Sequence, residues 1–202
     1  MINCVNEIAR SISFDCAHPI VGGYTGRGIL IPWESVESVS HDNNNPRKVL
    51  GITVKTDSIV CGLDNTAMTT PLEGSSTTGN ADAGFAQFVK VISGRILTRG
   101  AQNSADLVEP LTKSVNGFIA ILEKKDKVGD GSYEVIGLLQ PLRCADPASI
   151  VRNENENGGS ISFSLQATEP WFEVTFMPTP REAESQWQAS KSAFEALLES
   201  AV

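Results

Sequence analysis

The stretch AHPIVGGYTGRGILIPW, residues 17–33, combines four glycines with Arg27, which are residue types that bind phosphate in nucleotide-binding loops. Such loops place backbone amides at the start of a helix, in orders such as G-x-G-x-x-G or G-x-x-x-x-G-K-[ST]. Here the order is G-G-x-x-G-x-G, and the strand-like residues 29–33 that follow include a proline. We therefore predict a turn with positive φ angles that leads into a strand, and no cofactor-binding site.

The two histidines do not indicate a catalytic site. His18 precedes a proline, and His41 stands beside Asp42 in HDNNNP, a turn-rich segment. His41 could act as a base that Asp42 orients, but two adjacent loop residues are explained more simply as a solvated surface pair. The chain also lacks the G-x-S-x-G nucleophile elbow of many hydrolases. We expect no enzymatic activity.

Metal sites are not predicted either. The cysteines (Cys4, Cys16, Cys61 and Cys144) form no C-x-x-C pair and have no histidine at ligand spacing, so we expect small buried thiols in a reducing cytoplasm. The loop KKDKVGDGS contains Asp126 and Asp130 but lacks the D-x-[DN]-x-[DN]-G order of a calcium loop.

Composition and charge narrow the function classes. The 202 residues are 41% hydrophobic and 20% charged, with a formal net charge of −8, as expected for a chain with one well-buried core. The negative charge argues against a protein that grips nucleic acid through its phosphates, although DNA could slide past such a surface. The N-terminus does not read as a signal peptide, and no segment approaches the about 18 consecutive apolar residues of a membrane span.

Apolar residues recur mostly with period two, which predicts half-buried strands. Predicted strands include residues 29–33, with Ile29, Ile31 and Trp33 on one face, and SISFSLQ (residues 160–166) and WFEVTF, with Phe172, Val174 and Phe176 on one face. Predicted hairpins join residues 52–54 to 59–61, and 118–123 to 133–139. These short strands indicate a mainly β fold, an antiparallel sandwich or barrel, and not a parallel α/β sheet.

The polar segment GSSTTGNADAG, residues 74–84, predicts a long flexible loop inside one domain, because the strand-like FAQFVKVISGRI follows at once. We therefore expect a β-rich domain over residues 1–178, with a long loop at about 62–84, and a C-terminal amphipathic helix over residues 179–202.

Two helices are expected. A short or kinked one spans residues 104–114, interrupted by Pro110. The terminal helix begins with Thr179 as cap, Pro180 as first residue and Glu182 completing a capping box, and it runs to about Ser200. Its apolar face comprises Trp187, Phe194, Leu197, Leu198 and Ala201. Packing of this face on its own domain is the simpler interpretation, and docking on another subunit the other.

The segment SISFDCAHPIVGGYTGRGILIPWESVES resembles the N-terminal stretch of small virion proteins of tailed phages, particularly phages that infect Bacteroidetes. YEVIGLLQPLRC, followed by a polar loop and SISFSLQ, is similar to the second half of many tail tube proteins. The resemblance covers roughly residues 11–176 and is one of pattern. The terminal helix departs from the simplest tube proteins.

The resemblance implies a sandwich or barrel whose copies form rings, hexameric or of higher symmetry, with inner strands joined into a barrel that lines a channel. A ring of the head–tail junction of a crAss-like phage is the related possibility. The partners would be further copies, neighbouring virion proteins, and DNA as passing cargo, without membrane binding. The location would be the virion, after synthesis in the bacterial cytoplasm. Negative charge on the channel wall would let DNA pass without adhering.

Two other functions stay open: a cellular binding module that docks through its terminal helix, and, less favoured, a nucleotide-binding enzyme. For the virion protein, the candidate contacts between subunits are Gly74, Ser75, Thr78, Asn80, Asp126, Lys127, Asp130, Trp187, Phe194, Leu197 and Leu198.

Overall fold

The computed structural model describes residues 22–64, 73–78, 88–96, 109–127, 131–144, 151–153 and 160–199. The elements follow the chain as β1 (Tyr24–Pro32), η1 (Trp33–Ser35), β2 (Val36–His41), β3 (Lys48–Val54), β4 (Cys61–Asp64), β5 (Glu73–Thr78), β6 (Phe88–Ile96), α2 (Glu109–Lys113), β7 (Phe118–Lys124), β8 (Tyr133–Ile136), β9 (Arg143–Cys144), β10 (Val151–Asn153), β11 (Ser160–Glu169), β12 (Thr175–Phe176) and α3 (Gln186–Glu199).

The strands form two sheets. The larger sheet has the order β2-β3-β12-β8-β7-β1-β4, and the smaller has the order β10-β11-β6-β5, with β9 also paired to β11. All pairs are antiparallel except β12 with β3. The described strands do not close either sheet into a barrel, so the mainly β sandwich expected from the sequence is confirmed.

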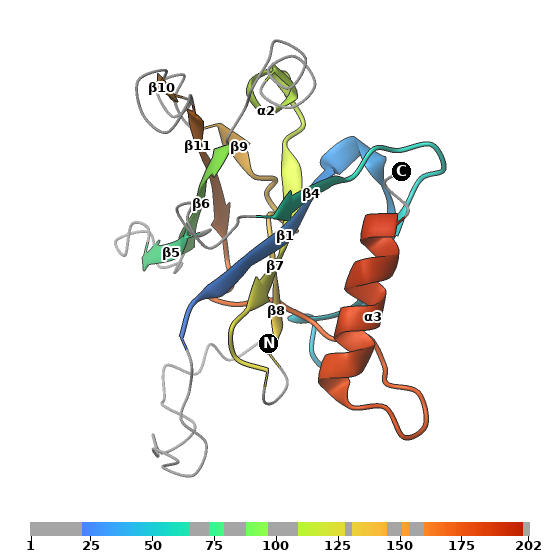
Figure 1. Ribbon diagram of the computed structural model, residues 1–202. Helices are drawn as coiled ribbons and strands as arrows, with labels where there is room; N and C mark the ends of the chain where they lie inside the picture. The colour runs from blue at the N-terminus through green and yellow to red at the C-terminus, as the bar shows by residue number, and fades with distance from the viewer. Residues whose placement is uncertain are drawn as a thin grey trace, which may run out of the picture.

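The strands at the centre of the larger sheet are buried on both faces. Along β7, alternate residues enter two separate clusters: Ile119 and Ile121 lie in one, and Ala120 and Leu122 in the other. The first cluster includes Phe194 of α3, and the second includes residues of β6 and β11. The molecule therefore has three layers, α3, the larger sheet and the smaller sheet (Figure 1). A strand covered on both faces reads as a continuous apolar run, as FIAIL does here.

Several predicted elements are confirmed. Strands β7 and β8 form the hairpin expected for residues 118–123 and 133–139, and four alternate residues of β11 are buried (Ile161, Phe163, Leu165 and Ala167). The glycine-rich stretch leads into β1. Gly23 and Gly26 have φ angles of +96°, and Gly26 lies where the β1–β7 register shifts. That conformation favours glycine, as the sequence suggested.

The prediction of a long flexible loop at residues 74–84 is wrong for the part of this segment that the structure describes. Residues 73–78 form β5, paired to β6 along its whole length, and Cys61–Asp64 at the start of the expected loop form β4. The small polar sequence lacks apolar alternation, so its strand is specified by main-chain pairing to β6 and not by its own burial pattern. Residues 79–84 lie outside the described part of the chain.

The hairpin expected between residues 52–54 and 59–61 is also wrong. Residues 56–57 do turn, with Asp57 at φ +66°, but β4 pairs with β1, and β3 pairs with β2 and β12. A turn signal alone does not fix which strand a chain pairs with after it. The face predicted for WFEVTF holds for Val174 and Phe176, whereas Phe172 is 58% exposed, because the regular strand is limited to Thr175–Phe176.

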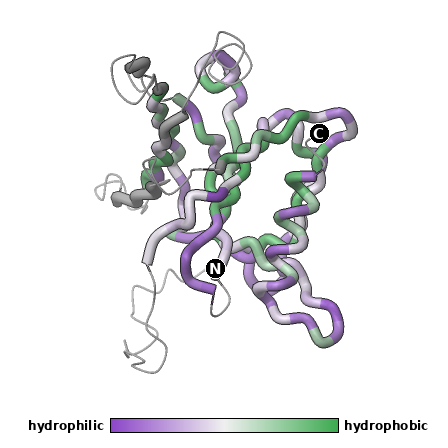
Figure 2. The backbone as a smooth tube through the Cα atoms, in the orientation of Figure 1, coloured by the Kyte–Doolittle hydropathy of each residue, from purple (hydrophilic) through white to green (hydrophobic). Residues whose placement is uncertain are grey.

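The terminal helix is shorter than predicted, and only part of the first predicted helix is described. The first, α2, contains Glu109–Lys113, with Pro110 in its first turn, where a missing amide hydrogen costs nothing; residues 104–108 lie outside the described residues. The terminal helix begins at Gln186 and not at Pro180. Its capping box is Ser185 with Gln188: the Gln188 amide donates to Ser185 Oγ at 3.3 Å, and the Ser185 amide donates to Gln188 Oε1 at 2.9 Å. Figure 2 shows the hydrophilic loop that precedes α3.

Candidate functional site

The described part of the glycine-rich stretch, residues 22–28, enters β1 and does not begin a helix. Arg27 lies in β1, where its Nη1 is 4.0 Å from Glu123 Oε2 and 3.9 Å from Glu195 Oε1, and its guanidinium lies 5.7 Å from the centre of the Phe194 ring. The cation therefore faces carboxylates and an aromatic face of its own chain. Tyr24 donates its hydroxyl to Glu134 Oε2 at 2.7 Å. Burial, first, and the nearby Glu134 carboxylate raise the pKa of Tyr24 well above its ordinary value.

The predicted histidine loop is a turn, as expected. His41 Nδ1 lies 3.0 Å from the carbonyl oxygen of Pro46, and Asp42 Oδ1 accepts the amides of Asn44 at 2.7 Å and Asn45 at 3.1 Å. Asp42 therefore holds the loop backbone instead of orienting the imidazole. His18 lies outside the described residues.

The metal and cysteine predictions can be followed only in part. Cys61 and Cys144 are half-buried and form no disulfide with each other, and burial raises the pKa of Cys61; Cys4 and Cys16 are not among the described residues. In the part of the chain that the structure describes, no three His, Cys, Asp or Glu residues are grouped to hold a metal ion. Within that same part, no helix is long and apolar enough to span a membrane.

The candidate contacts on the terminal helix serve their own domain. Phe194 is fully buried, and its ring centre lies 5.0 Å from that of Tyr133, with the two rings tilted by 37°; Trp187, Leu197 and Leu198 are partly buried against the same cluster. Phe194 is therefore unavailable to a second subunit, which corrects that prediction. The physical reason is the second apolar face of the larger sheet, which needs a cover, and α3 provides it.

The other candidate contacts are dispersed. Gly74, Ser75 and Thr78 lie in β5, while Asp126 and Lys127 lie in the loop between β7 and β8. Lys127 is ion-paired with Glu123, and its Nζ lies 6.0 Å from the ring centres of both Tyr133 and Trp187. Asn80 and Asp130 fall outside the described residues.

Glu123 is the centre of a polar cluster between β7 and α3. Its side chain is 7% exposed and accepts hydrogen bonds from Thr25 Oγ1 at 2.8 Å and from the Tyr133 hydroxyl at 3.3 Å, besides the Lys127 ion pair. Burial would raise the pKa of this carboxyl, but the hydrogen bonds from Lys127 and Thr25 and the charges of Lys127 and Arg27 outweigh it and hold the pKa below its ordinary value. The cluster fixes α3 to the sheet through Arg27 and Glu195.

A second cluster of charges lies between the two sheets, and sequence reasoning missed it. Lys90 of β6, Glu134 of β8 and Glu169 of β11 are all buried. Lys90 Nζ lies 3.2 Å from Glu134 Oε1 and 3.4 Å from Glu169 Oε2. The sequence did carry a signal: Glu169 continues the inward alternation of β11, and Lys90 stands between Phe88 and Ile92 in the same alternation of β6.

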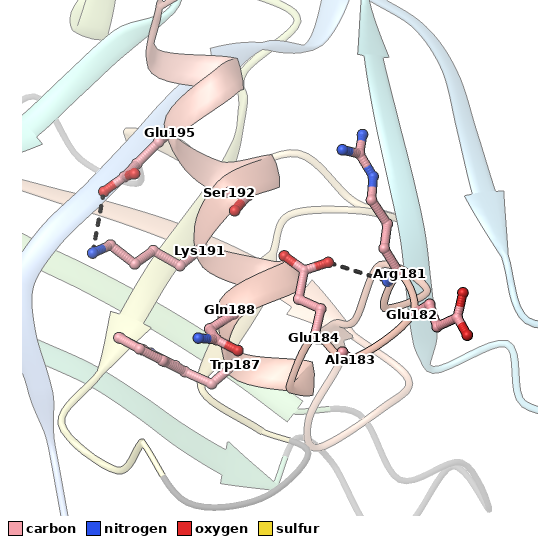
Figure 3. A pocket seen from close by; sticks show the side chains of 9 residues that line it. All are labelled: Arg181, Glu182, Ala183, Glu184, Trp187, Gln188, Lys191, Ser192 and Glu195. Atoms are coloured by element: carbon pink, nitrogen blue, oxygen red, sulfur yellow. Dashed lines mark hydrogen bonds and ion pairs between the residues drawn. The ribbon is translucent and has the colours of Figure 1, made fainter.

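A shallow hollow lies beside the first turns of α3 (Figure 3). It is lined by both signs of charge, with Arg181 donating its amide to Glu184 Oε2 at 3.1 Å and Lys191 Nζ 3.8 Å from Glu195 Oε1. Lys191 and Glu184 thus have partners within the same segment, and the mixed lining indicates no particular ligand.

The sheet edges are the remaining candidate surface. Among the described residues, no strand pairs with the outer sides of β2, β4, β5 or β10. The β2 edge has register shifts at two places, and β4 and β10 have four and three residues. Short or bulged edges resist association, whereas β5 pairs with β6 at six consecutive residues without a bulge. The outer side of β5 is thus the most regular edge described.

Comparison with known proteins gives no relative: no protein-family model, no curated protein and no solved structure matches the chain.

Proposed function

We propose that this chain is a structural virion protein of a tailed phage that assembles into a ring of the tail tube or of the head–tail conduit. The observation that carries the proposal is the smaller sheet. Its outermost strands, β5 and β10, have no further partner among the described strands. Joining β5 of one copy to β10 of the next would continue the sheet around a ring and satisfy both rows of main-chain groups.

The exposed face of this sheet suits a channel wall. Most residues of β11 and β6 that point away from the core between the sheets are uncharged (Ser162, Ser164, Gln166, Thr168, Val89, Val91 and Ser93), but the register places Arg95 of β6, Glu73 of β5 and Arg143 of β9 on the same face. The hydroxyls, the amide and the short apolar groups of β11 and β6 would bind DNA phosphates only weakly, and Arg95 and Arg143 are the cations that the register places on this face. In this described part of the face, the acidic wall expected from the net charge is not present: the face is mostly neutral and carries both signs of charge.

The other two functions find less support. A binding module that docks through α3 needs a free apolar helix face, but that face packs on the larger sheet. A nucleotide-binding enzyme needs the glycine-rich stretch at a helix start, but the stretch enters β1. Assembly into a virion ring is the function that uses the outer edges of β5 and β10, which have no partner among the described strands.

Assembly of the purified chain tests the proposal. Negative-stain microscopy at the highest soluble concentration should show rings or short tubes, and light scattering should give the mass of a closed oligomer. A subunit that stays monomeric under these conditions would contradict the proposal.

A pair of variants tests the β5 edge itself. Ser75 and Ser76 are adjacent in β5, so their amides point to opposite sides of the strand, one toward β6 and one outward. Proline removes the amide hydrogen in either case. Of Ser75→Pro and Ser76→Pro, we expect one to lower the melting temperature and the other to keep it but abolish rings. If the variant that keeps the wild-type melting temperature still forms rings, β5 is not the interface.

A further inference from the structure

The ion cluster between the sheets has two features that a stabilising salt bridge does not need. Lys90 is 1% exposed, and two carboxylates face its ammonium, those of Glu134 and Glu169, with side chains 9% and 1% exposed. The Lys90 ammonium therefore lies between two carboxylates in a region of low dielectric, where buried charge is costly, and only Glu134 has a second cation nearby, the partly exposed Lys124.

The two oxygens of Glu169 have different surroundings. Oε1 accepts the backbone N–H groups of Gly137, at 3.0 Å, and of Leu138, at 2.9 Å. Oε2 is buried and accepts no hydrogen bond from the described residues, although it lies 3.4 Å from Lys90 Nζ. Two backbone donors on one carboxyl oxygen form the arrangement that stabilises an oxyanion when a nucleophile attacks the carbon.

Glu134 lies on the other side of Lys90 and is held in place. Its Oε1 is 3.2 Å from Lys90 Nζ, while its Oε2 accepts the Tyr24 hydroxyl at 2.7 Å and lies 3.6 Å from Lys124 Nζ. A carboxylate fixed at this distance can take a proton from the ammonium.

We propose that Lys90 and Glu169 condense within the folded chain to form an amide cross-link, with Glu134 as the catalytic residue that transfers protons. Lys90 gives a proton to Glu134, which passes it to Oε2 of Glu169, and the resulting amine attacks Cδ of this neutral carboxyl group. The new N–Cδ bond moves an electron pair onto Oε1, which the two backbone N–H groups stabilise.

The condensation needs no co-reactant. When the electron pair returns from Oε1, the Cδ–Oε2 bond breaks, and Oε2 leaves as water with the two protons that Lys90 has lost, passed on through Glu134. An ammonium and a carboxylate become an amide and a water, nothing is oxidised or reduced, and Glu134 returns to its initial state.

The product fits the same surroundings better than the ions do. The amide oxygen keeps the hydrogen bonds from Gly137 and Leu138, and the amide N–H faces Glu134 Oε1. A buried ammonium and a carboxyl oxygen without a hydrogen bond both disappear. The geometry also needs no movement of strands: Lys90 pairs with Ala167, so Glu169 is its diagonal neighbour on the same face of the adjacent strand.

The chain contains a matched control pair. Lys113 and Glu109 of α2 are also in contact as an ion pair, but their side chains are 72% and 54% exposed. The pair has no buried amine and no pair of backbone donors on the carboxylate among the described contacts, so we expect it to remain two ions.

Mass spectrometry of the wild-type chain under denaturing conditions tests the proposal without any variant. The expected mass is lower than the sequence mass by one water, and proteolysis should yield a branched peptide that joins residues 90 and 169. Peptides with residues 109 and 113 should be unbranched. Lys90→Arg and Glu134→Gln should each restore the full mass of their own sequences.

Three results would overturn the proposal. The first is the full sequence mass after prolonged incubation of the folded protein. The second is a branch at residue 134 in place of 169. The third is a water deficit that maps only to the Asp130-Gly131 sequence, where an aspartimide gives the same mass change.

Discussion

Replacement of Phe194 by alanine tests whether α3 is an integral layer of the domain. Phe194 is fully buried, its ring lies 5.0 Å from that of Tyr133, and the Arg27 guanidinium lies 5.7 Å from its centre. Truncation of a buried phenylalanine costs about 3–5 kcal/mol, because it removes apolar area and leaves a cavity. For a chain of this length, about 2–4 °C of melting temperature per kcal/mol converts this into a loss of about 6–20 °C.

Phe172 provides the matched control, since it is 58% exposed and its one described ring contact is with Phe88 at 5.5 Å. Phe172→Ala should cost about 0.5–1.5 kcal/mol, the value of an aromatic pair. Urea unfolding followed by circular dichroism measures both variants, and an unchanged slope with a lower midpoint identifies a change in stability. If Phe194→Ala costs no more than Phe172→Ala, α3 is not packed on the sheet, and its apolar face is free for a partner.

Two further predictions concern the N-terminal cap of α3 and the buried Glu123 carboxylate that lies between β7 and α3. Ser185→Ala should lower the stability by about 1 kcal/mol by removing the cap of α3, whereas Thr179→Ala, at the start predicted from sequence, should change it little; calorimetry of both variants decides which residue caps the helix. The lowered pKa of Glu123 means that its contribution is present above the ordinary glutamate pKa of about 4.3 and is lost as the pH falls through the lower value in the folded state. Wild type should therefore lose stability on acidification more steeply than Glu123→Gln, and parallel curves from pH 6 to pH 2 would exclude this role of the carboxylate.

The sequence predicts the elements whose own pattern decides their structure. The alternation of β11, the β7–β8 hairpin and the glycines before β1 were readable because burial on one face, a short connection and positive φ angles are local properties. The β5 strand was not readable, because a row of small polar residues contains no burial pattern, and β6 alone supplies its pairing. The same holds for β4, which leaves its turn to pair with β1.

The start of α3 shows how two local signals can compete. Thr179, Pro180 and Glu182 match a capping box, but so do Ser185 and Gln188. The second is used because residues 181–184 make a turn of their own, closed by the Glu184 amide, which donates to the carbonyl oxygen of Arg181 at 3.0 Å, with Ala183 at φ +66°. The helix then begins where Phe194 can reach the core, a requirement that lies outside the local sequence.

The buried charges show where sequence reasoning stops for the site. The alternation places Lys90 and Glu169 inward, so their burial could have been predicted from β6 and β11 alone. Their shared partner could not, because Glu134 is 44 residues from Lys90 and lies in the other sheet. Glu134 stands between Tyr133 and Val135, which face α3, so it must face the smaller sheet. The three side chains meet only because the two sheets stack, so the sandwich itself brings one buried ammonium and two buried carboxylates together.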